Sequence, residues 1–282
     1  MKKMILITFL ALCTGQLLEG AQHTYELVRT LTGHASTVKA LAALPDGRLA
    51  SGADDSTIKV WNPTTGEEKV TLTGHTGPIN ALTVLPDGRL VSGSSDNTIK
   101  IWNPATGKVE ITLTGHRDRV VALAILPDGR LASGSWDNTI KIWNLKTNKQ
   151  ELTLTGHTNN AFLTLAALSD DKLASGGWYE TIKIWNLRTK KQELTLTGHK
   201  YSDVESLAVL FDGKLATGSR DNTIKVWNPT TGKEELTLTG HTNTVSALTV
   251  LPNGKLVSGS SDGTIKIWQA KEIKKEGFCL IQ

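Results

Sequence analysis

Residues 74–102 read GHTGPINALTVLPDGRLVSGSSDNTIKIW, and this stretch decides the fold because the chain repeats it. Apolar and polar residues alternate from Ile79 to Thr83, and a Pro-Asp-Gly turn follows at 86–88. Two further β-prone runs, Arg89–Val91 and Thr98–Trp102, flank a turn rich in Ser, Asp and Asn. Short runs of this kind, broken by turn-forming clusters, are typical of successive β-hairpins. The stretch therefore predicts one small antiparallel sheet.

Six copies of this unit follow one another at intervals of 41 or 42 residues. The His of the Gly-His pair stands at His34, His75, His116, His157, His199 and His241, and a Trp follows at Trp61, Trp102, Trp143, Trp185, Trp227 and Trp268. A lone sheet of this size cannot bury both of its apolar faces, so neighbouring copies have to cover them. Radial packing of such sheets gives a propeller. We therefore predict an all-β fold, a six-bladed β-propeller of four-stranded antiparallel sheets over residues 24–268.

The repeated motif resembles the WD-repeat family, in which a Gly-His pair, a Pro-Asp-Gly turn, an Asp and a Trp recur at about 40–45 residues. One departure is uniform. Asn follows the Trp at Asn62, Asn103, Asn144, Asn186 and Asn228, and Gln269 follows it in the last copy. Asn makes the local turn hydrogen bonds that Asp makes at this position, so the predicted fold is unchanged.

Ring closure has two candidate strands. In the WD-repeat family the strand before the first Gly-His completes the last blade, so the resemblance implies that Thr24–Leu31 pairs with Thr264–Trp268. Within the tail 269–282, the stretch Gly277–Gln282 is also strand-like and is a possible extra outer strand. A seventh blade, common in the family, is the alternative to six, but it needs about 40 residues that the two tails barely supply.

The resemblance also implies a buried chain of hydrogen bonds from Trp to Ser or Thr, to His and to Asp in each blade. Its members by blade are Trp61, Ser51, His34, Asp55; Trp102, Ser92, His75, Asp96; Trp143, Ser133, His116, Asp137; Trp185, Ser175, His157; Trp227, Thr217, His199, Asp221; and Trp268, Ser258, His241, Asp262. Six of the seven histidines occupy this position. Because catalysis needs a unique cluster in a cleft, a set that recurs in all six copies indicates architecture. We predict no enzyme activity, no cofactor and no metal site.

The fourth copy departs from the others. It has Tyr179, followed by Glu180, where the other copies have the turn Asp, and Ser169-Asp170-Asp171 where most have Pro-Asp-Gly. Losing one partner of a buried hydrogen bond costs about 1–3 kcal/mol. We therefore expect the fourth blade to be the loosest unless Glu180 substitutes for the missing Asp.

Positions that differ between copies carry whatever is specific to this chain. The resemblance places partner contacts three and five residues after the His and just before the turn Asp. The fourth and fifth copies carry one extra residue after the His, which shifts their first two positions by one. The candidate contact residues on the third to fifth blades, with Tyr179 beside them, are Arg119, Val121, Trp136, Leu163, Trp178, Tyr179, Asp203, Glu205 and Arg220. Aromatic residues flanked by Arg are typical of binding hot spots. We predict that a protein or peptide partner binds here. The alternative is a glycan or small ligand that binds to the same Trp residues. A third possibility is that Trp136 and Trp178 only pack on neighbouring loops.

Composition restricts the other function classes. The net charge of +4 is small, and six of the lysines recur at one repeat position, so no basic face for nucleic acid is indicated. Two cysteines, Cys13 and Cys279, are too few for a disulfide framework. We expect a monomer without a membrane span.

Residues 1–21 resemble a secretory signal peptide. Lys2 and Lys3 precede an apolar run from Met4 to Leu12, and small residues follow it. The run is far shorter than the ~20 residues of a membrane-spanning helix. We therefore expect a secreted or extracytoplasmic protein; a lipoprotein attached through Cys13 and a cytoplasmic protein are the alternatives.

Overall fold

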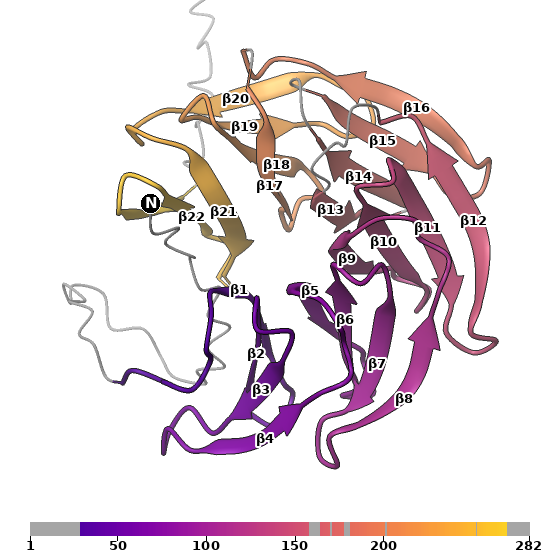
Figure 1. The fold of residues 1–282 in the computed structure, drawn as a ribbon. Helices are drawn as coiled ribbons and strands as arrows, with labels where there is room; N and C mark the ends of the chain where they lie inside the picture. The colour runs from indigo at the N-terminus through magenta and orange to yellow at the C-terminus, as the bar shows by residue number, and fades with distance from the viewer. Residues whose placement is uncertain are drawn as a thin grey trace, which may run out of the picture.

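The computed structural model describes residues 29–157, 164–169, 171–177, 181–200, 202–251 and 253–269. These residues form twenty-three β-strands, and no described residue lies in a helix (Figure 1). Accordingly, the described part of the chain offers no helical segment of the length and hydropathy that a membrane span needs. The signal-like residues 1–21 and the tail beyond Gln269 lie outside the described residues, so the structure tests neither of those predictions.

The strands group into six blades, numbered in chain order. Blade one has β1 (Val38–Ala43), β2 (Leu49–Ala53), β3 (Ile58–Trp61) and β4 (Glu68–Leu72). Blade two has β5 (Ile79–Val84), β6 (Leu90–Ser94), β7 (Ile99–Asn103) and β8 (Lys108–Leu113). Blade three has β9 (Val120–Ile125), β10 (Leu131–Ser135), β11 (Thr139–Asn144) and β12 (Lys149–Thr155). Blade four has β13 (Thr164–Ala167), β14 (Lys172–Gly176), β15 (Ile182–Asn186) and β16 (Lys191–Leu196). Blade five has β17 (Val204–Val209), β18 (Leu215–Ser219), β19 (Ile224–Trp227) and β20 (Glu234–Leu238). Blade six has β21 (Val245–Val250), β22 (Leu256–Ser260) and β23 (Ile265–Trp268).

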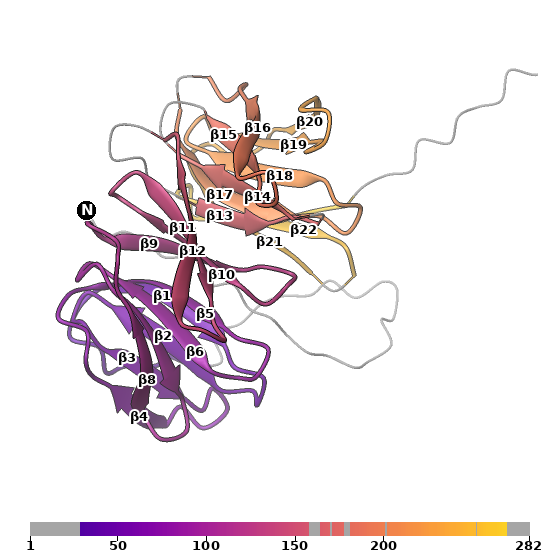
Figure 2. The same cartoon turned by 90° about the vertical axis from the view of Figure 1, so that its right-hand side faces the viewer.

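Each blade is an antiparallel meander in which consecutive strands pair. Five sheets have four strands, and the sixth has three within the described residues. The first strand of every blade lies innermost, and the fourth strands of the first five blades lie on the outside (Figure 1). Figure 2 shows the same blades from the side. This arrangement confirms the predicted all-β, six-bladed propeller.

Residues with a left-handed backbone form the tight turns between strands. Gly88 has φ of 87°, and its N–H donates to the Leu85 carbonyl at 2.9 Å. In the next turn Asn97 has φ of 69°, a region that Gly and Asn enter at low cost. The Gly of the Pro-Asp-Gly turn and the Asn of the Asp-Asn turn thus recur because these turns need a residue with a left-handed backbone.

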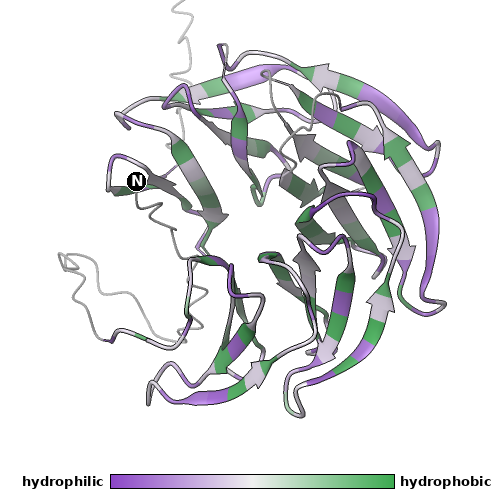
Figure 3. Cartoon of the chain, viewed as in Figure 1, coloured by the Kyte–Doolittle hydropathy of each residue, from purple (hydrophilic) through white to green (hydrophobic). Residues whose placement is uncertain are grey.

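The hydrophobic core consists of layers between neighbouring blades. Between blades two and three, Ile99 and Ile101 pack in one buried cluster with Val120 and Trp143. Figure 3 shows hydrophobic and hydrophilic residues alternating along the strands. This pattern is what a sheet needs when a neighbouring blade covers its apolar side chains.

Among the described residues, one face of β23 in the sixth blade is largely uncovered. Ile265 and Ile267 on β23 are 61% and 50% exposed, whereas the corresponding Ile58 and Val60 of β3, which share a buried cluster with Ile79 of the next blade, are 0% exposed. In the first five blades a fourth strand pairs with the outer edge of the third strand. Among the described residues, no strand pairs with the outer edge of β23.

The segment before the first Gly-His lies beside blade one in the same way that the fourth strand of blade one lies beside blade two. A β-carbon placed on Gly66 would lie 2.8 Å from the Arg29 side chain, just as one on Gly107 would lie 3.0 Å from Val70 of the preceding fourth strand. Residues 29–31 nevertheless form no strand. Of the predicted closing strand, residues 24–28 lie outside the described residues, so the predicted pairing with β23 stays a prediction.

Candidate functional site

Each fully described blade contains a buried network of hydrogen bonds. In blade three the indole Nε1–H of Trp143 donates to Ser133 Oγ at 2.8 Å. The same hydroxyl lies 2.7 Å from His116 Nε2, and His116 Nδ1 lies 2.9 Å from Asp137 Oδ2. Ser133 is 0% exposed. The network joins the second and third strands to the loop that precedes the blade.

The structure brings the same four groups together in four other blades. They are Trp61, Ser51, His34 and Asp55 in blade one; Trp102, Ser92, His75 and Asp96 in blade two; Trp227, Thr217, His199 and Asp221 in blade five; and Trp268, Ser258, His241 and Asp262 in blade six. In blade four Ser175 bonds Trp185 at 2.8 Å and His157 at 2.7 Å, and Tyr179 lies outside the described residues.

Hydrogen bonds keep the network carboxylates ionised. Burial raises the pKa of Asp55, but bonds from Thr57 and His34 outweigh it and hold the pKa at about 2. Asp221 has the same balance and a pKa of about 2. A carboxylate held in this way can receive the imidazole N–H and nearby backbone N–H groups without being protonated at neutral pH.

In the blades that carry a network Asp, the Ser or Thr, the His and the Asp resemble a hydrolase triad only in residue type. A serine nucleophile has to reach a substrate and give its proton to the imidazole. Here the Ser133 hydroxyl is fully buried and already accepts the Trp143 indole N–H. Such satisfied buried networks rigidify a fold. We infer that each of these hydrogen-bond networks stabilises its own blade.

The predicted partner-contact positions lie at the opposite end of the blades from the Pro-Asp-Gly turns, because β2, β6 and their equivalents run from one to the other. In blade five, Arg220 pairs with Asp203 at 2.9 Å and with Glu205 at 2.6 Å. In blade one, Lys39 pairs with Asp54 at 2.5 Å. These positions therefore contact one another in blades one and five.

Blade three carries a different pair at the same positions. The guanidinium carbon of Arg119 lies 4.8 Å from the ring centroid of Trp136, and the backbone N–H of Trp136 donates to the Arg119 carbonyl at 3.0 Å. Arg119 is exposed and Trp136 is half-buried. Val121 packs against the buried cluster between blades three and four, so it contributes to the core more than its predicted docking role assumes. Leu163, Trp178 and Tyr179 lie outside the described residues.

The comparison with protein families agrees with this geometry. The model described as "WD domain, G-beta repeat" matches six times, over residues 25–62, 66–103, 107–144, 148–186, 190–228 and 232–269. The chain belongs to the WD-repeat family. Each WD repeat of the match ends one residue after a network Trp, on the Asn or Gln that replaces Asp.

Two solved structures share the fold of this chain. "Structure of U3-55K" matches with a TM-score of 0.78 and 24% identity, covering 86% of this chain and 80% of that one. "Crystal structure of WD40 beta propeller domain of Doa1" matches with a TM-score of 0.73 and 25% identity, covering 83% and 79%. No curated protein sequence matches this chain.

The Asn that replaces the family's Asp forms an Asx turn in this WD-repeat chain. Asn62 Oδ1 accepts the N–H groups of Thr64 at 2.9 Å and Thr65 at 3.1 Å. The other four Asn residues at this position make the same pair of bonds. The bonds fix the turn between the third and fourth strands, as Asp does at such turns.

The histidine of the fourth WD repeat titrates differently from an ordinary imidazole. Burial, aided by the charge of Lys183, lowers the pKa of His157 to about 4. Burial also lowers the pKa of His75, although Asp96 opposes the shift. The neutral imidazole of His157 is thus the form that the folded blade accommodates at neutral pH.

We expect the free energy of unfolding to fall as the pH falls from about 6.5 towards 4. The folded-state pKa of His157, about 4, lies below the unfolded value of about 6.5, so the unfolded chain binds more protons in this window. One such group contributes at most about 1.4 kcal/mol per pH unit. Urea unfolding across this window measures the slope, and His157→Gln, which cannot titrate, is expected to reduce it. An equal slope in both proteins would contradict the assignment.

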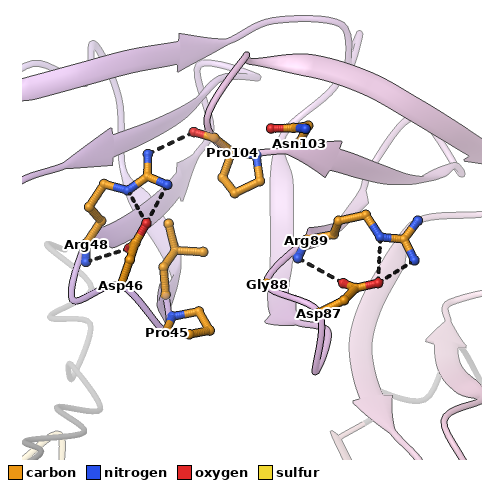
Figure 4. Close-up of a pocket in the computed structure, with 9 residues that line it drawn as sticks. Pro45, Asp46, Arg48, Asp87, Gly88, Arg89, Asn103 and Pro104 are labelled. Atoms are coloured by element: carbon orange, nitrogen blue, oxygen red, sulfur yellow. Dashed lines mark hydrogen bonds and ion pairs between the residues drawn. The ribbon is translucent and has the colours of Figure 1, made fainter.

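A shallow pocket opens between WD repeats one and two at the Pro-Asp-Gly end, and the repeat pattern did not predict it. Its volume is about 270 Å³, and its walls carry the Asp46–Arg48 and Asp87–Arg89 ion pairs (Figure 4). Pro104 lines it, whereas Leu145 and Leu187 at the equivalent positions of the next two blades pack into the core. Pro stands at the same position in blades one and five, at Pro63 and Pro229, so the Pro-for-Leu difference alone does not mark the pocket in the sequence.

Proposed function

We propose that this WD-repeat protein is a non-catalytic scaffold that binds a protein or peptide partner on the face of blades three to five that carries Trp136. WD-repeat propellers are typically protein-interaction scaffolds, and the chain has this fold over all six repeats. Fold alone does not assign function, so the proposal depends on a site. That site is the Arg119–Trp136 pair.

The pair has the composition and exposure of a binding anchor. Trp and Arg are the residues most enriched in interface hot spots. Trp136 is half-buried, and Arg119 is exposed beside it with its guanidinium over the indole ring. The corresponding positions of blades two and six carry Ser95 and Ser261, which offer no comparable apolar surface.

The stacking geometry favours a protein or peptide over a glycan. A sugar ring would stack on an open face of the indole, but the Arg119 guanidinium covers one face of Trp136. A protein interface instead uses such a pair together with a charged rim, and Asp203, Glu205 and Arg220 supply one on blade five. We therefore rank glycan binding second.

The double variant Trp136→Ala/Trp178→Ala is expected to lose specific partners in affinity capture, because both large side chains of the proposed face are removed. Thr244→Ala/Ser261→Ala, at the corresponding positions of blade six, is the matched control and is expected to retain them. Both variants are first checked for unchanged thermal unfolding. Retention of the same partners by the folded Trp double variant would refute this face; loss by both variants would point to a broader surface.

A further inference from the structure

Blade five shows how this surface holds a guanidinium group. Each blade presents three positions here: two on or just before its first strand and one just before the turn Asp. In blade five Arg220 occupies the third position, and carboxylates occupy the first two, with Asp203 at 2.9 Å and Glu205 at 2.6 Å from its nitrogens. The blade geometry thus places two carboxylates around one Arg.

Blade three presents the guanidinium without the carboxylates. Arg119 stands at the first position, Val121 at the second and Trp136 at the third. Arg119 is exposed and forms no ion pair with another described residue; the same is true of its neighbour Arg117. By contrast, Arg48, Arg89 and Arg220 each pair with an acidic residue of their own blade.

The Trp136 ring restricts the Arg119 guanidinium. The cation lies 4.8 Å from the ring centroid, within the range of a cation–π contact. A stacked guanidinium keeps the N–H groups at its edge available for in-plane hydrogen bonds, and its planar fork matches a carboxylate. Since the stack orders the side chain beforehand, less conformational entropy is lost when a carboxylate binds.

We propose that Arg119, held on the Trp136 ring, binds the carboxylate of an Asp or Glu side chain in an acidic segment of the partner. This inference rests on the proposed function and adds the chemistry of the partner. Arg117, exposed on the same blade, adds positive charge and favours the same acidic segment.

The test uses fluorescein-labelled twelve-residue peptides made of Glu, Leu, Gly and Ser, each matched to the same peptide with Gln for every Glu. Fluorescence anisotropy is expected to show binding of the Glu peptides only, with affinity that falls as salt is added. Arg119→Gln is expected to weaken binding about tenfold or more, as loss of a charge-assisted hydrogen-bond pair does, and Arg119→Lys by less. Arg188→Gln removes a guanidinium on the opposite face, 80% exposed and paired with Asp171, and is expected to change nothing.

Three results would overturn the proposal. Equal binding of Glu and Gln peptides, or equal binding by Arg119→Gln, would remove the carboxylate from the mechanism. Binding of a phosphoserine peptide but of no Glu peptide would assign Arg119 to phosphate.

The proposed function can stand without this inference. If natural partners are lost by the Trp136→Ala/Trp178→Ala variant but retained by Arg119→Gln, the face binds its partner without a carboxylate on Arg119.

Discussion

Replacing Ser133 by alanine is expected to lower the free energy of unfolding by about 2–6 kcal/mol, although only one oxygen atom is removed. The Ser133 hydroxyl bonds both the Trp143 indole and the His116 imidazole, at 2.8 and 2.7 Å, in a site with no exposure to water. Its loss leaves two buried polar groups unsatisfied, and each costs about 1–3 kcal/mol. Urea unfolding followed by circular dichroism measures the change.

Blade five supplies the matched control for this prediction. Thr217 occupies the same position there and makes the same two bonds, 2.9 Å to Trp227 and 2.7 Å to His199. Ser133→Thr is therefore expected to retain most of the stability that Ser133→Ala loses. If both variants lose the same amount, steric fit at this position matters more than the hydrogen bonds. A loss below about 1 kcal/mol in Ser133→Ala would contradict a role for the network in stability.

The repeat made the fold predictable from the sequence. A strand register is ambiguous in a single copy, but six copies show which positions keep their residue type. The turn residues at Gly88 and Asn97 fix the hairpins through their left-handed backbones. Buried polar groups need partners, so a Ser, His and Trp that recur together indicate one network. The bonds of Ser133 are of this kind.

The surface was less predictable, because no repeat constrains it. Spacing placed Val121 among exposed residues, but its side chain packs against the core between blades three and four. The stack of Arg119 on Trp136 depends on side-chain rotamers, and sequence spacing does not determine them. The pocket beside Pro104 depends on how far one side chain reaches into a seam, which requires coordinates.

Two segments compete to complete the sixth blade, and the described residues favour the N-terminal one. Arg29 lies against Gly66 in the place that Val70 takes against Gly107. The C-terminal route requires a hairpin directly after β23, but Gln269 stands where five other copies have the Asn that forms the Asx turn. We therefore expect residues 24–31 to close the ring on β23.

A chain that begins at residue 33 is expected to be about 1.5–3 kcal/mol less stable than one that begins at residue 22, and to self-associate. Ile265 and Ile267 are 61% and 50% exposed on the face that the next blade covers in blade one, so about half of the 1.5–3 kcal/mol that burying each Ile provides is still available when the closing strand joins the sixth blade to the first. Without that strand, the unpaired edge of β23 is a template for association between copies. Thermal unfolding and size-exclusion chromatography measure both effects. A chain of residues 22–269, which lacks the C-terminal tail, is the control. Its thermal stability is expected to match that of the chain that begins at residue 22 and keeps the tail. If removal of the tail destabilises the protein and removal of residues 22–32 does not, the C-terminal segment closes the ring.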